Sequence, residues 1–346
     1  MNDLDYEFVL QDRVAKIRAM NVLHDLEHNS SQSCSFGLDS MVNSRLLDIA
    51  LPNNKIPRVF VNTGIEHHLI RKFAYECVKK DDRVVIITPK VNVKKMLNTE
   101  GYPFKSKQHS QNYGVYFRNK ARIQELVKKI ENDKNLAFNY EFIHNLPRGV
   151  KSVIKYIFGT REREILTSIQ IVPKALEYQF KEDISLFISD KCCLRMKEQP
   201  LDNWNKEHNK TIAILGLRND EGGRRSIHKG CYAFNDKTGM ATFSPLKVVT
   251  DEWEQEFIKR EKIELCELYY PPYNFKRTGC IGCPFNRNLQ EDLNTMYKLL
   301  PNEYYQCLHL WKPVYDEYIR IGYRLKYYPH EKGVQMNIFD YEEIEE

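Results

Sequence analysis

No run in this 346-residue sequence reaches the roughly 18 to 20 apolar residues that a membrane-spanning helix needs. The first five residues, Met1–Asp5, also lack the basic start and apolar centre of a signal peptide. We therefore expect a cytoplasmic protein without a membrane partner. In a reducing compartment the nine cysteines are not expected to form disulfides, so clustered cysteines favour a metal site or a catalytic role.

Length and charge limit the possible organisation. The chain has room for one large domain with an insertion or for two domains, and its hydrophobic content of 42% is enough for a core. Of the net charge of +5, the segment from Lys105 to Lys181 contributes +8, because it holds fifteen Lys and Arg against seven Asp and Glu, which leaves −3 for the rest. This basic segment is either a solvated helical face or a surface for nucleic-acid phosphates.

Three short apolar runs predict buried strands. They cover residues 58–61, 83–87 and 211–215, and segments with helical periodicity separate them. Such a pattern is typical of a parallel sheet covered on both faces, so we predict an α/β fold with a doubly wound, mostly parallel sheet. Residues 6–27 are predicted to form one long amphipathic helix before it.

The segment Ser35–Ser40, with the sequence SFGLDS, has the composition of a phosphate-binding loop that leads into a helix. Small residues allow backbone N–H groups to close around an anion, and the helix dipole favours negative charge. The segment does not match the G-x-x-x-x-G-K-[ST] pattern of P-loop kinases. The alternative is an ordinary strand-to-helix turn capped by Asp39 or Ser40.

Further polar residues follow the predicted strands, where ligands bind in parallel sheets. Residues 62–64, Asn-Thr-Gly, come after the first strand, and Gly216 and Arg218 come after the third. The second segment continues through Glu221 to Arg224 and Arg225. Arginines among glycines are suited to holding an anion by bidentate hydrogen bonds, although an exposed basic loop is the alternative.

Composition suggests a division into five parts. We predict an N-terminal helix over residues 1–30, a nucleotide-binding core over 31–110 and 182–250, a basic helical insertion over 111–181, a C-terminal cysteine-containing region over 251–330, and an acidic tail over 331–346.

Four cysteines occur as two tight pairs, Cys192-Cys193 and Cys280-x-x-Cys283, with 86 residues between them. Two such pairs suggest a shared metal site. Directly adjacent cysteines are awkward ligands for one tetrahedral zinc ion, because neighbouring side chains diverge. We therefore favour a [4Fe-4S] cluster, with zinc or unligated buried thiols as the alternatives.

Together these motifs resemble the phosphoadenosine phosphosulfate (PAPS) reductase family of the adenine nucleotide α-hydrolase superfamily, which includes the PP-loop ATP pyrophosphatases. The 35–40 segment resembles their S-G-G-x-D-S loop, residues 61–64 resemble V-D-T-G, and residues 216–221 resemble G-x-R-x-x-E. Residues 276–284, KRTGCIGCP, with Cys192-Cys193, resemble the cluster pattern of iron–sulfur adenylyl-sulfate reductases. The pattern also resembles the ATP pyrophosphatase subunit of DNA phosphorothioation systems.

This resemblance implies that ATP binds with Mg²⁺ and is cleaved between its α- and β-phosphates, which adenylates an acceptor that sulfur then attacks. It implies nucleotide contacts from Ser35, Gly37, Asp39, Ser40, Asn62, Thr63, Gly64, Gly216, Arg218 and Glu221. Asp39, Ser40, Arg218 and Arg225 would be the catalytic residues, the arginines by stabilising charge at the reacting phosphate. DNA is the expected acceptor, and a cysteine desulfurase or another modification subunit is an expected partner.

Departures from the family keep two alternatives open. Sulfonucleotide reductases, which release sulfite from PAPS or adenylyl sulfate, carry a nucleophilic cysteine in an E-C-G-L-H segment that is absent here. Only Cys307 follows Cys283, and its aromatic neighbours suggest packing. Phe36, Leu38 and Gly222 replace residues usual in the family, which leaves a non-catalytic module that binds nucleotide or nucleic acid as the third hypothesis.

The acidic tail contains a segment, QMNIFD at 335–340, that resembles peptides docking into bacterial sliding clamps. Gln335, Ile338 and Phe339 would be its anchors. The alternative is that the tail folds back on its own protein. A sliding clamp is therefore an expected partner.

Overall fold

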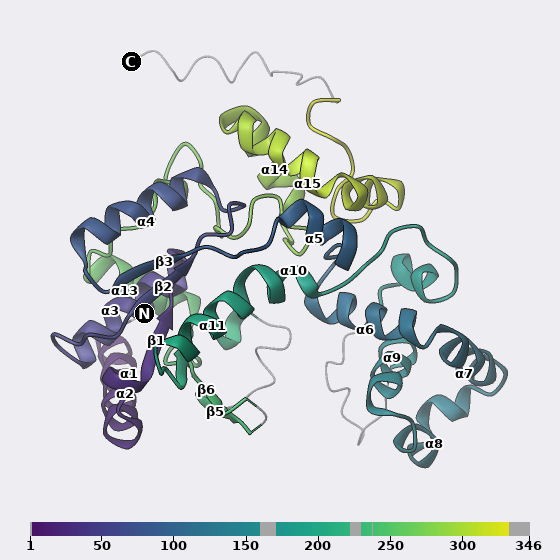
Figure 1. Ribbon diagram of the computed structural model, residues 1–346, viewed down its shortest axis with the longest axis horizontal. Helices are drawn as coiled ribbons and strands as arrows, with labels where there is room; N and C mark the ends of the chain where they lie inside the picture. The colour runs from purple at the N-terminus through teal and green to yellow at the C-terminus, as the bar shows by residue number, and fades with distance from the viewer. Residues whose placement is uncertain (1, 160–170, 222–229, 237, 332–346) are drawn as a thin grey trace. The chain divides into compact units, whose positions relative to one another are not determined.

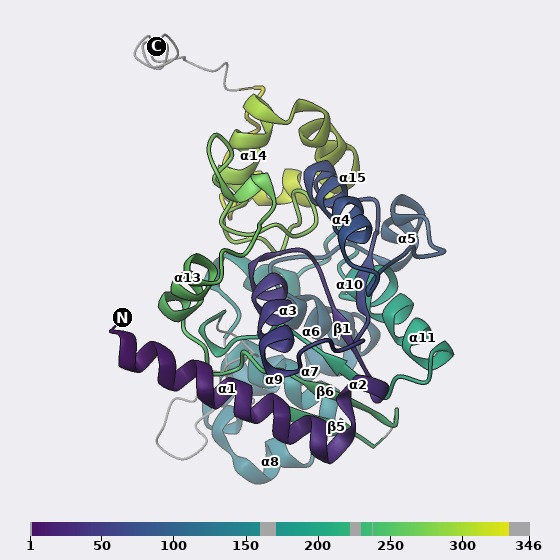
Figure 2. The same ribbon diagram turned by 90° about the vertical axis from the view of Figure 1, so that its left-hand side faces the viewer.

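The structure is a computed structural model that describes residues 2–159, 171–221, 230–236 and 238–331. The chain divides into two compact units (Figures 1 and 2). The first consists of Met1–Val91 and Arg195–Ile281, and the second of Asn92–Leu194 and Gly282–Glu346. Residues 92–110 and 182–194, which composition assigned to the nucleotide-binding core, thus belong to the second unit, and residues 251–281 to the first. The five-part division itself stays a prediction.

A six-stranded sheet forms the centre of the first unit, in the order β3-β2-β1-β4-β6-β5. All neighbouring strands are parallel except β5 and β6. The strands are β1 (Ser30–Ser33), β2 (Arg58–Val61), β3 (Val84–Ile87), β4 (Ile212–Ile214), β5 (Tyr232–Asn235) and β6 (Met240–Phe243). Because β1 lies between β2 and β4, the strand order reverses there, and ligands in such sheets bind beyond the carboxyl ends at that point. The predicted α/β fold class is confirmed.

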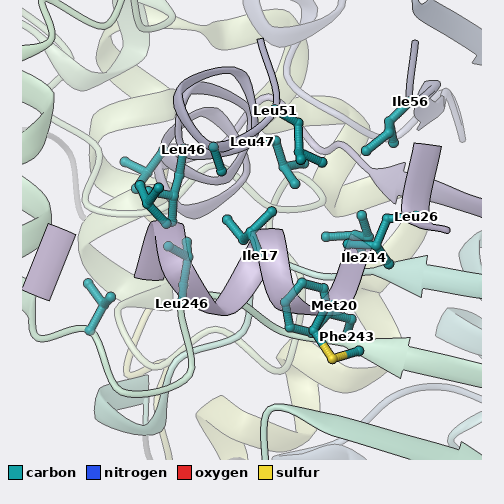
Figure 3. Packing of buried hydrophobic residues seen from close by; sticks show 14 of the residues in the cluster. Ile17, Met20, Leu26, Leu46, Leu47, Leu51, Ile56, Ile214, Phe243 and Leu246 are labelled. Atoms are coloured by element: carbon teal, nitrogen blue, oxygen red, sulfur yellow. The ribbon is translucent and has the colours of Figure 1, made fainter. Parts of the chain in front are cut away.

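Two groups of helices cover the sheet. The helices of this unit are α1 (Asp3–His24), α2 (Leu26–Asn29), α3 (Leu38–Ala50), α4 (His68–Lys80), α11 (Gln199–Glu207) and α13 (Asp251–Arg260). On one face Ile17 and Met20 of α1 pack with Leu46 of α3, Ile214 and Phe243 (Figure 3). On the other face Leu201 and Trp204 of α11 pack against Val59 and Val61 of β2. The sheet is thus buried on both sides, as its continuous apolar strands predict.

The N-terminal helix is shorter than predicted at its C-terminal end. Asp25 adopts the left-handed conformation at φ 49°, which ends α1 at His24 and separates it from the four-residue α2. The predicted span of 6–27 therefore crosses a break. Leu26, just beyond the break, is buried in the same core as Ile17.

The second unit is helical where it is described. Its α-helices are α5 (Val93–Glu100), α6 (Lys107–Arg118), α7 (Lys120–Asn132), α8 (Tyr140–His144), α9 (Arg148–Phe158), α10 (Lys191–Cys193), α14 (Leu289–Leu299) and α15 (Pro301–Arg320). Tyr113 and Tyr116 of α6 and Tyr156 of α9 surround Phe180 with edge-to-face ring contacts. Among the described residues, no helix is long and apolar enough to cross a membrane.

Candidate nucleotide site at the carboxyl ends of the strands

The 35–40 loop connects the end of β1 to the N-terminus of α3, with Gly37 as the N-cap residue. Its polar groups converge. The Ser40 hydroxyl donates to the Gly37 carbonyl at 2.8 Å and lies 3.4 Å from Ser35 Oγ, which also accepts from the Gly37 amide at 3.4 Å. The start of a 13-residue helix adds a positive dipole end to these hydroxyls. This geometry is suited to a phosphate group.

Phe36 occupies the loop position where the resembling family has glycine. Its φ of 56° is the left-handed conformation that glycine adopts without strain. The Phe36 ring is buried and makes edge-to-face contacts with Phe60 of β2 at 5.3 Å and with Phe73 of α4 at 5.9 Å between centroids. The replacement therefore packs the loop onto the core, and the backbone keeps the conformation that glycine would allow.

Gly216 lies directly against this loop. A Cβ atom on Gly216 would be 2.9 Å from the Asp39 carbonyl oxygen and 3.0 Å from its carbonyl carbon, closer than real Cβ atoms approach a backbone. Glycine is thus required by a close backbone approach between the segment after β4 and the first turn of α3. The structure thereby brings two of the predicted motifs together.

Arg218 contacts a carboxylate with each of its three guanidinium nitrogens. Nε pairs with Asp39 at 2.5 Å, and the two terminal nitrogens pair with Asp251 at 2.5 Å and Glu254 at 2.9 Å. Glu254 is only 1% exposed, and burial together with the nearby Asp39 charge raises the pKa of its carboxyl. A phosphate can therefore reach Arg218 only by competing with carboxylates that already hold it.

Sequence reasoning missed Asp251 and Glu254. Both lie in the first turn of α13, where acidic residues commonly interact with the helix dipole, so their composition carried no signal of a site. Only the buried apolar Trp253 and Phe257 on the same helix, which fix its orientation against α1 and α3, place these carboxylates at Arg218.

The Asn62-Thr63-Gly64 segment forms a turn closed by Glu66. The Glu66 carboxylate accepts from the Thr63 amide at 2.9 Å and from its hydroxyl at 2.7 Å. The Gly64 amide donates to Asn62 Oδ1 at 3.2 Å, and Gly64 has a positive φ of 79°. Glu66 is buried and lies 3.3 Å from the Lys197 ammonium, so this missed carboxylate fixes the turn.

The segment before the first unit ends connects both loops. Tyr269 Oη accepts from the Leu38 amide at 3.2 Å and shares a hydrogen bond of 2.6 Å with Thr278 Oγ1. Further along, Cys280 forms an isolated antiparallel bridge with Glu66, and the Ile281 amide donates to the Ile65 carbonyl at 2.7 Å.

The segment from Tyr269 to Ile281 therefore contacts the 35–40 loop at one end and the 62–66 turn at the other. Tyr269 and Thr278 were not predicted as site residues. An aromatic residue ten positions before a cysteine motif gives no sequence signal of a hydrogen bond to a distant helix N-terminus.

The four predicted metal ligands are divided between the units. Cys280 belongs to the first, and Cys192, Cys193 and Cys283 belong to the second. All nine cysteines are free thiols. Burial raises the pKa of the Cys280 thiol, and the charge of Lys197 opposes this shift. Within the described ranges, no group of three or more His, Cys, Asp or Glu side chains is arranged to hold a metal ion.

Cys307 is fully buried in α15. Burial and the nearby Glu303 charge raise the pKa of its thiol well above the usual value. A Cβ on Gly282 would be 2.6 Å from Cys307 Sγ, so the cysteine fills space beneath the C-x-x-C turn. A buried thiol with a raised pKa is a poor nucleophile, which agrees with the packing role expected from its aromatic neighbours.

Several predicted residues cannot be placed. Glu221 ends a short 3-10 helix, Asn219–Glu221. Gly222, Arg224 and Arg225 lie outside the described residues, as does the whole tail segment with Gln335, Ile338 and Phe339.

Comparisons with known proteins follow this geometry. Among solved structures, the fold is similar to a phosphoadenylyl-sulfate reductase from Candida auris in a phosphate complex, with 12% identity, a TM-score of 0.41, and coverage of 81% of this chain and 96% of that one. It is also similar to the U34-tRNA thiolase NcsA from Methanococcus maripaludis with its [4Fe-4S] cluster, with 14% identity, a TM-score of 0.37, and coverage of 89% and 80%. No curated protein matches in sequence.

The phosphoadenosine phosphosulfate reductase domain matches residues 29–139 and 151–286. The matched ranges contain β1, the 35–40 loop, the 62–66 turn, Arg218 and the C-x-x-C motif. Since they make up well over half of the sequence, this chain belongs to the phosphoadenosine phosphosulfate reductase domain family.

Proposed function

We propose that this protein binds ATP at the 35–40 loop, cleaves it between the α- and β-phosphates, and so activates an acceptor for sulfur transfer to nucleic acid, with DNA as the preferred acceptor. The observation that carries the proposal is the convergence of Ser35, Gly37 and Ser40 at the N-terminus of α3, next to Gly216. Such a site holds a chain of phosphates through backbone amides, hydroxyls and a helix dipole.

The chemistry required of the protein is positioning and charge stabilisation. The loop would hold the β- and γ-phosphates as the leaving group, and an acceptor oxygen would attack the α-phosphate and release pyrophosphate. Arg218 would exchange one carboxylate partner for the reacting phosphate, which increases its interaction with negative charge as the bond breaks. Mg²⁺ needs only one or two carboxylates beside the phosphates, so Asp39 suits it as a ligand.

Sulfur transfer is the less direct part of the proposal. Free thiols at Cys192, Cys193, Cys280 and Cys283 are the soft donors that a [4Fe-4S] cluster requires, and the support for them as a set is their spacing in the sequence. When bound, such a cluster would supply or relay sulfur. A cysteine desulfurase as sulfur source and a sliding clamp as partner follow from the sequence pattern alone.

The decisive experiment measures the products of ATP labelled at the α-phosphate, in the presence of DNA and a sulfide donor. AMP and pyrophosphate are expected from the unaltered protein and should fall at least about a hundredfold in Asp39→Asn, a loss typical when a positioned charge is removed. Asp82→Asn is the matched control, because Asp82 is exposed and only 3.7 Å from the exposed Lys55. Release of ADP, or no product above background, would contradict the proposal.

A sulfonucleotide reductase remains the second candidate, because the matching family carries that name. It predicts sulfite from PAPS or adenylyl sulfate and a thiol donor. The burial of Cys307 disfavours it, because no other cysteine follows the C-x-x-C motif. Sulfite release that is lost in Cys307→Ser would reverse this order.

A further inference from the structure

Lys105, in the second unit, carries a buried positive charge. Its side chain is 8% exposed, and the residue adopts a left-handed φ of 56° just before Ser106, the N-cap of α6. The ammonium donates to Tyr156 Oη at 3.1 Å and lies 5.5 Å from the centre of that ring. Within the described part of the chain, no carboxylate pairs with it. A buried ammonium is costly unless it is paired, so its presence requires an explanation.

The groups behind Lys105 cannot neutralise it. Gln179 Oε1 lies 2.7 Å from His109 Nε2, and Tyr156 Oη lies 2.9 Å from His109 Nδ1. Because Gln179 Oε1 can only accept, Nε2 carries the ring proton and Nδ1 accepts from Tyr156. The Tyr156 oxygen is then left to accept from Lys105. Burial lowers the pKa of His109 to about 3, so the imidazole is neutral and the chain of hydrogen bonds orients the ammonium without offsetting its charge.

Two arginines bring further positive charge to the same place. The Tyr318 hydroxyl accepts from the Lys105 amide at 2.7 Å and donates to the Pro284 carbonyl at 2.9 Å. Arg324 donates to that same carbonyl at 2.8 Å, so Lys105 and Arg324 are joined through two intermediate groups. The charges of Arg324 and of the exposed Arg287 both disfavour the protonated form of Lys105.

Three cations from distant parts of the sequence thus converge although they repel one another. Arg287 lies on the loop before α14, and Arg324 follows α15. Side chains that served only packing would not need charge at all three positions. Guanidinium and ammonium groups together are the donors that bind tetrahedral oxyanions, and the exposure of Arg287 leaves an approach from solvent.

We propose that Lys105, Arg287 and Arg324 form a binding site for a tetrahedral oxyanion, a phosphate or sulfate group. The site is distinct from the 35–40 loop, since all three residues belong to the second unit, and it does not depend on the proposed ATP chemistry. The same oxyanion can be a free inorganic ion or one phosphodiester of a nucleic acid.

The test is isothermal titration calorimetry of the full chain with inorganic sulfate, and separately with the dinucleotide TpT. Saturable sulfate binding is expected in the unaltered protein and equally in Asp39→Asn, which removes the proposed ATP site. It should weaken at least about tenfold in Lys105→Gln and in Arg287→Gln, as loss of a charged hydrogen bond requires. Lys298→Gln, at an exposed position of α14, is the control and should bind as the unaltered protein does.

Arg287→Gln keeps the test valid if Lys105→Gln does not fold, because Arg287 is exposed. TpT binding that is lost in the same variants would assign the oxyanion to a nucleic-acid backbone, and sulfate binding without TpT binding would assign it to a small anion. Sulfate affinity that is unchanged in both Lys105→Gln and Arg287→Gln, or that disappears in Asp39→Asn, would overturn the proposal.

Discussion

Arg218 and Asp39 form an ion pair of 2.5 Å that joins the segment after β4 to the first turn of α3. Asp251 and Glu254 complete the pairing of the guanidinium. The arginine that the sequence suggests for binding phosphate is therefore also a structural connection between three segments. Its removal should affect folding and ligand binding together.

Arg218→Gln should destabilise the protein by about 3 kcal/mol, because it leaves the buried Glu254 without its cation. The measurement is urea denaturation followed by circular dichroism. Arg45→Gln is the matched control, since Arg45 pairs with Glu261 at 2.7 Å but is half exposed, and should cost less than about 1 kcal/mol. Equal losses in the two variants would show that the Arg218 cluster has no special role.

Glu254→Gln tests the opposite sign on ligand binding. Removing one carboxylate leaves more of the Arg218 charge available, so the affinity for a non-hydrolysable ATP analogue should rise a few-fold in calorimetric titration. Weaker binding in this variant would mean that Arg218 must be held by all three carboxylates to act.

Gly216→Ala should destabilise the protein by about 1–3 kcal/mol and weaken ATP-analogue binding, because the added Cβ would overlap the Asp39 backbone at 2.9 Å. Gly279→Ala is the control, since a Cβ there meets no atom within 4 Å. Denaturation and nucleotide titration of both variants decide the matter. A Gly216→Ala protein that matches Gly279→Ala in both measurements would remove the close approach from the argument.

The sheet could be predicted only where its strands are apolar. Residues 58–61 and 83–87 are continuous apolar runs and correspond to β2 and β3. β1, with the sequence SSQS, is central and buried but was not predicted, because its side chains are polar. They are satisfied by partners that sequence does not reveal: Ser31 donates to Asn205 at 2.6 Å, and Gln32 donates to the Ser40 carbonyl at 2.8 Å.

The candidate site was predicted in part for a similar reason. The 35–40 loop, Gly216 and Arg218 have recognisable local patterns, and the structure brings them together. Glu66, Tyr269 and Glu254 act through contacts with residues far away in the sequence, so no local pattern identifies them.

Phe36→Gly should destabilise the protein by about 2–4 kcal/mol, because the loss of a buried ring outweighs the 1–2 kcal/mol or so gained by relieving a left-handed residue. Phe36→Leu keeps most of the buried volume and should lose about half as much. Urea denaturation of the pair measures both effects. A glycine variant that is more stable than the parent would show that backbone strain, and not the contacts with Phe60 and Phe73, dominates at this position.

The cysteine pattern predicts about four iron and four acid-labile sulfide per chain in anaerobically purified protein. Both should be lost in Cys280→Ser and in Cys283→Ser. Cys77→Ser, at an unpaired and partly exposed cysteine, should keep them. Zinc in place of iron would make the motif structural and would shift the activity towards ATP chemistry without a cluster.

Lys105→Met should make the protein more stable at pH 7. Burial and the charges of Arg324 and Arg287 lower the pKa of Lys105 to about 8, against an ordinary value of about 10.5. Below pH 8 the folded protein therefore carries the full penalty of a buried ammonium, about 3 kcal/mol, of which the hydrogen bond to Tyr156 returns about 1. The variant should gain about 2 kcal/mol in free energy of unfolding, measured with urea.

The pH dependence provides the sharper part of this prediction. Between pH 8 and about 10.5 the unfolded chain binds more protons at Lys105 than the folded protein does, so the stability of the parent rises relative to that of the variant and the difference closes. Tyrosines that titrate at high pH affect both proteins equally, and Lys298→Met should show no such trend. A parent that is more stable than Lys105→Met at pH 7 would mean that the ammonium already has a stabilising partner, and a site that is costly when empty would no longer explain its burial.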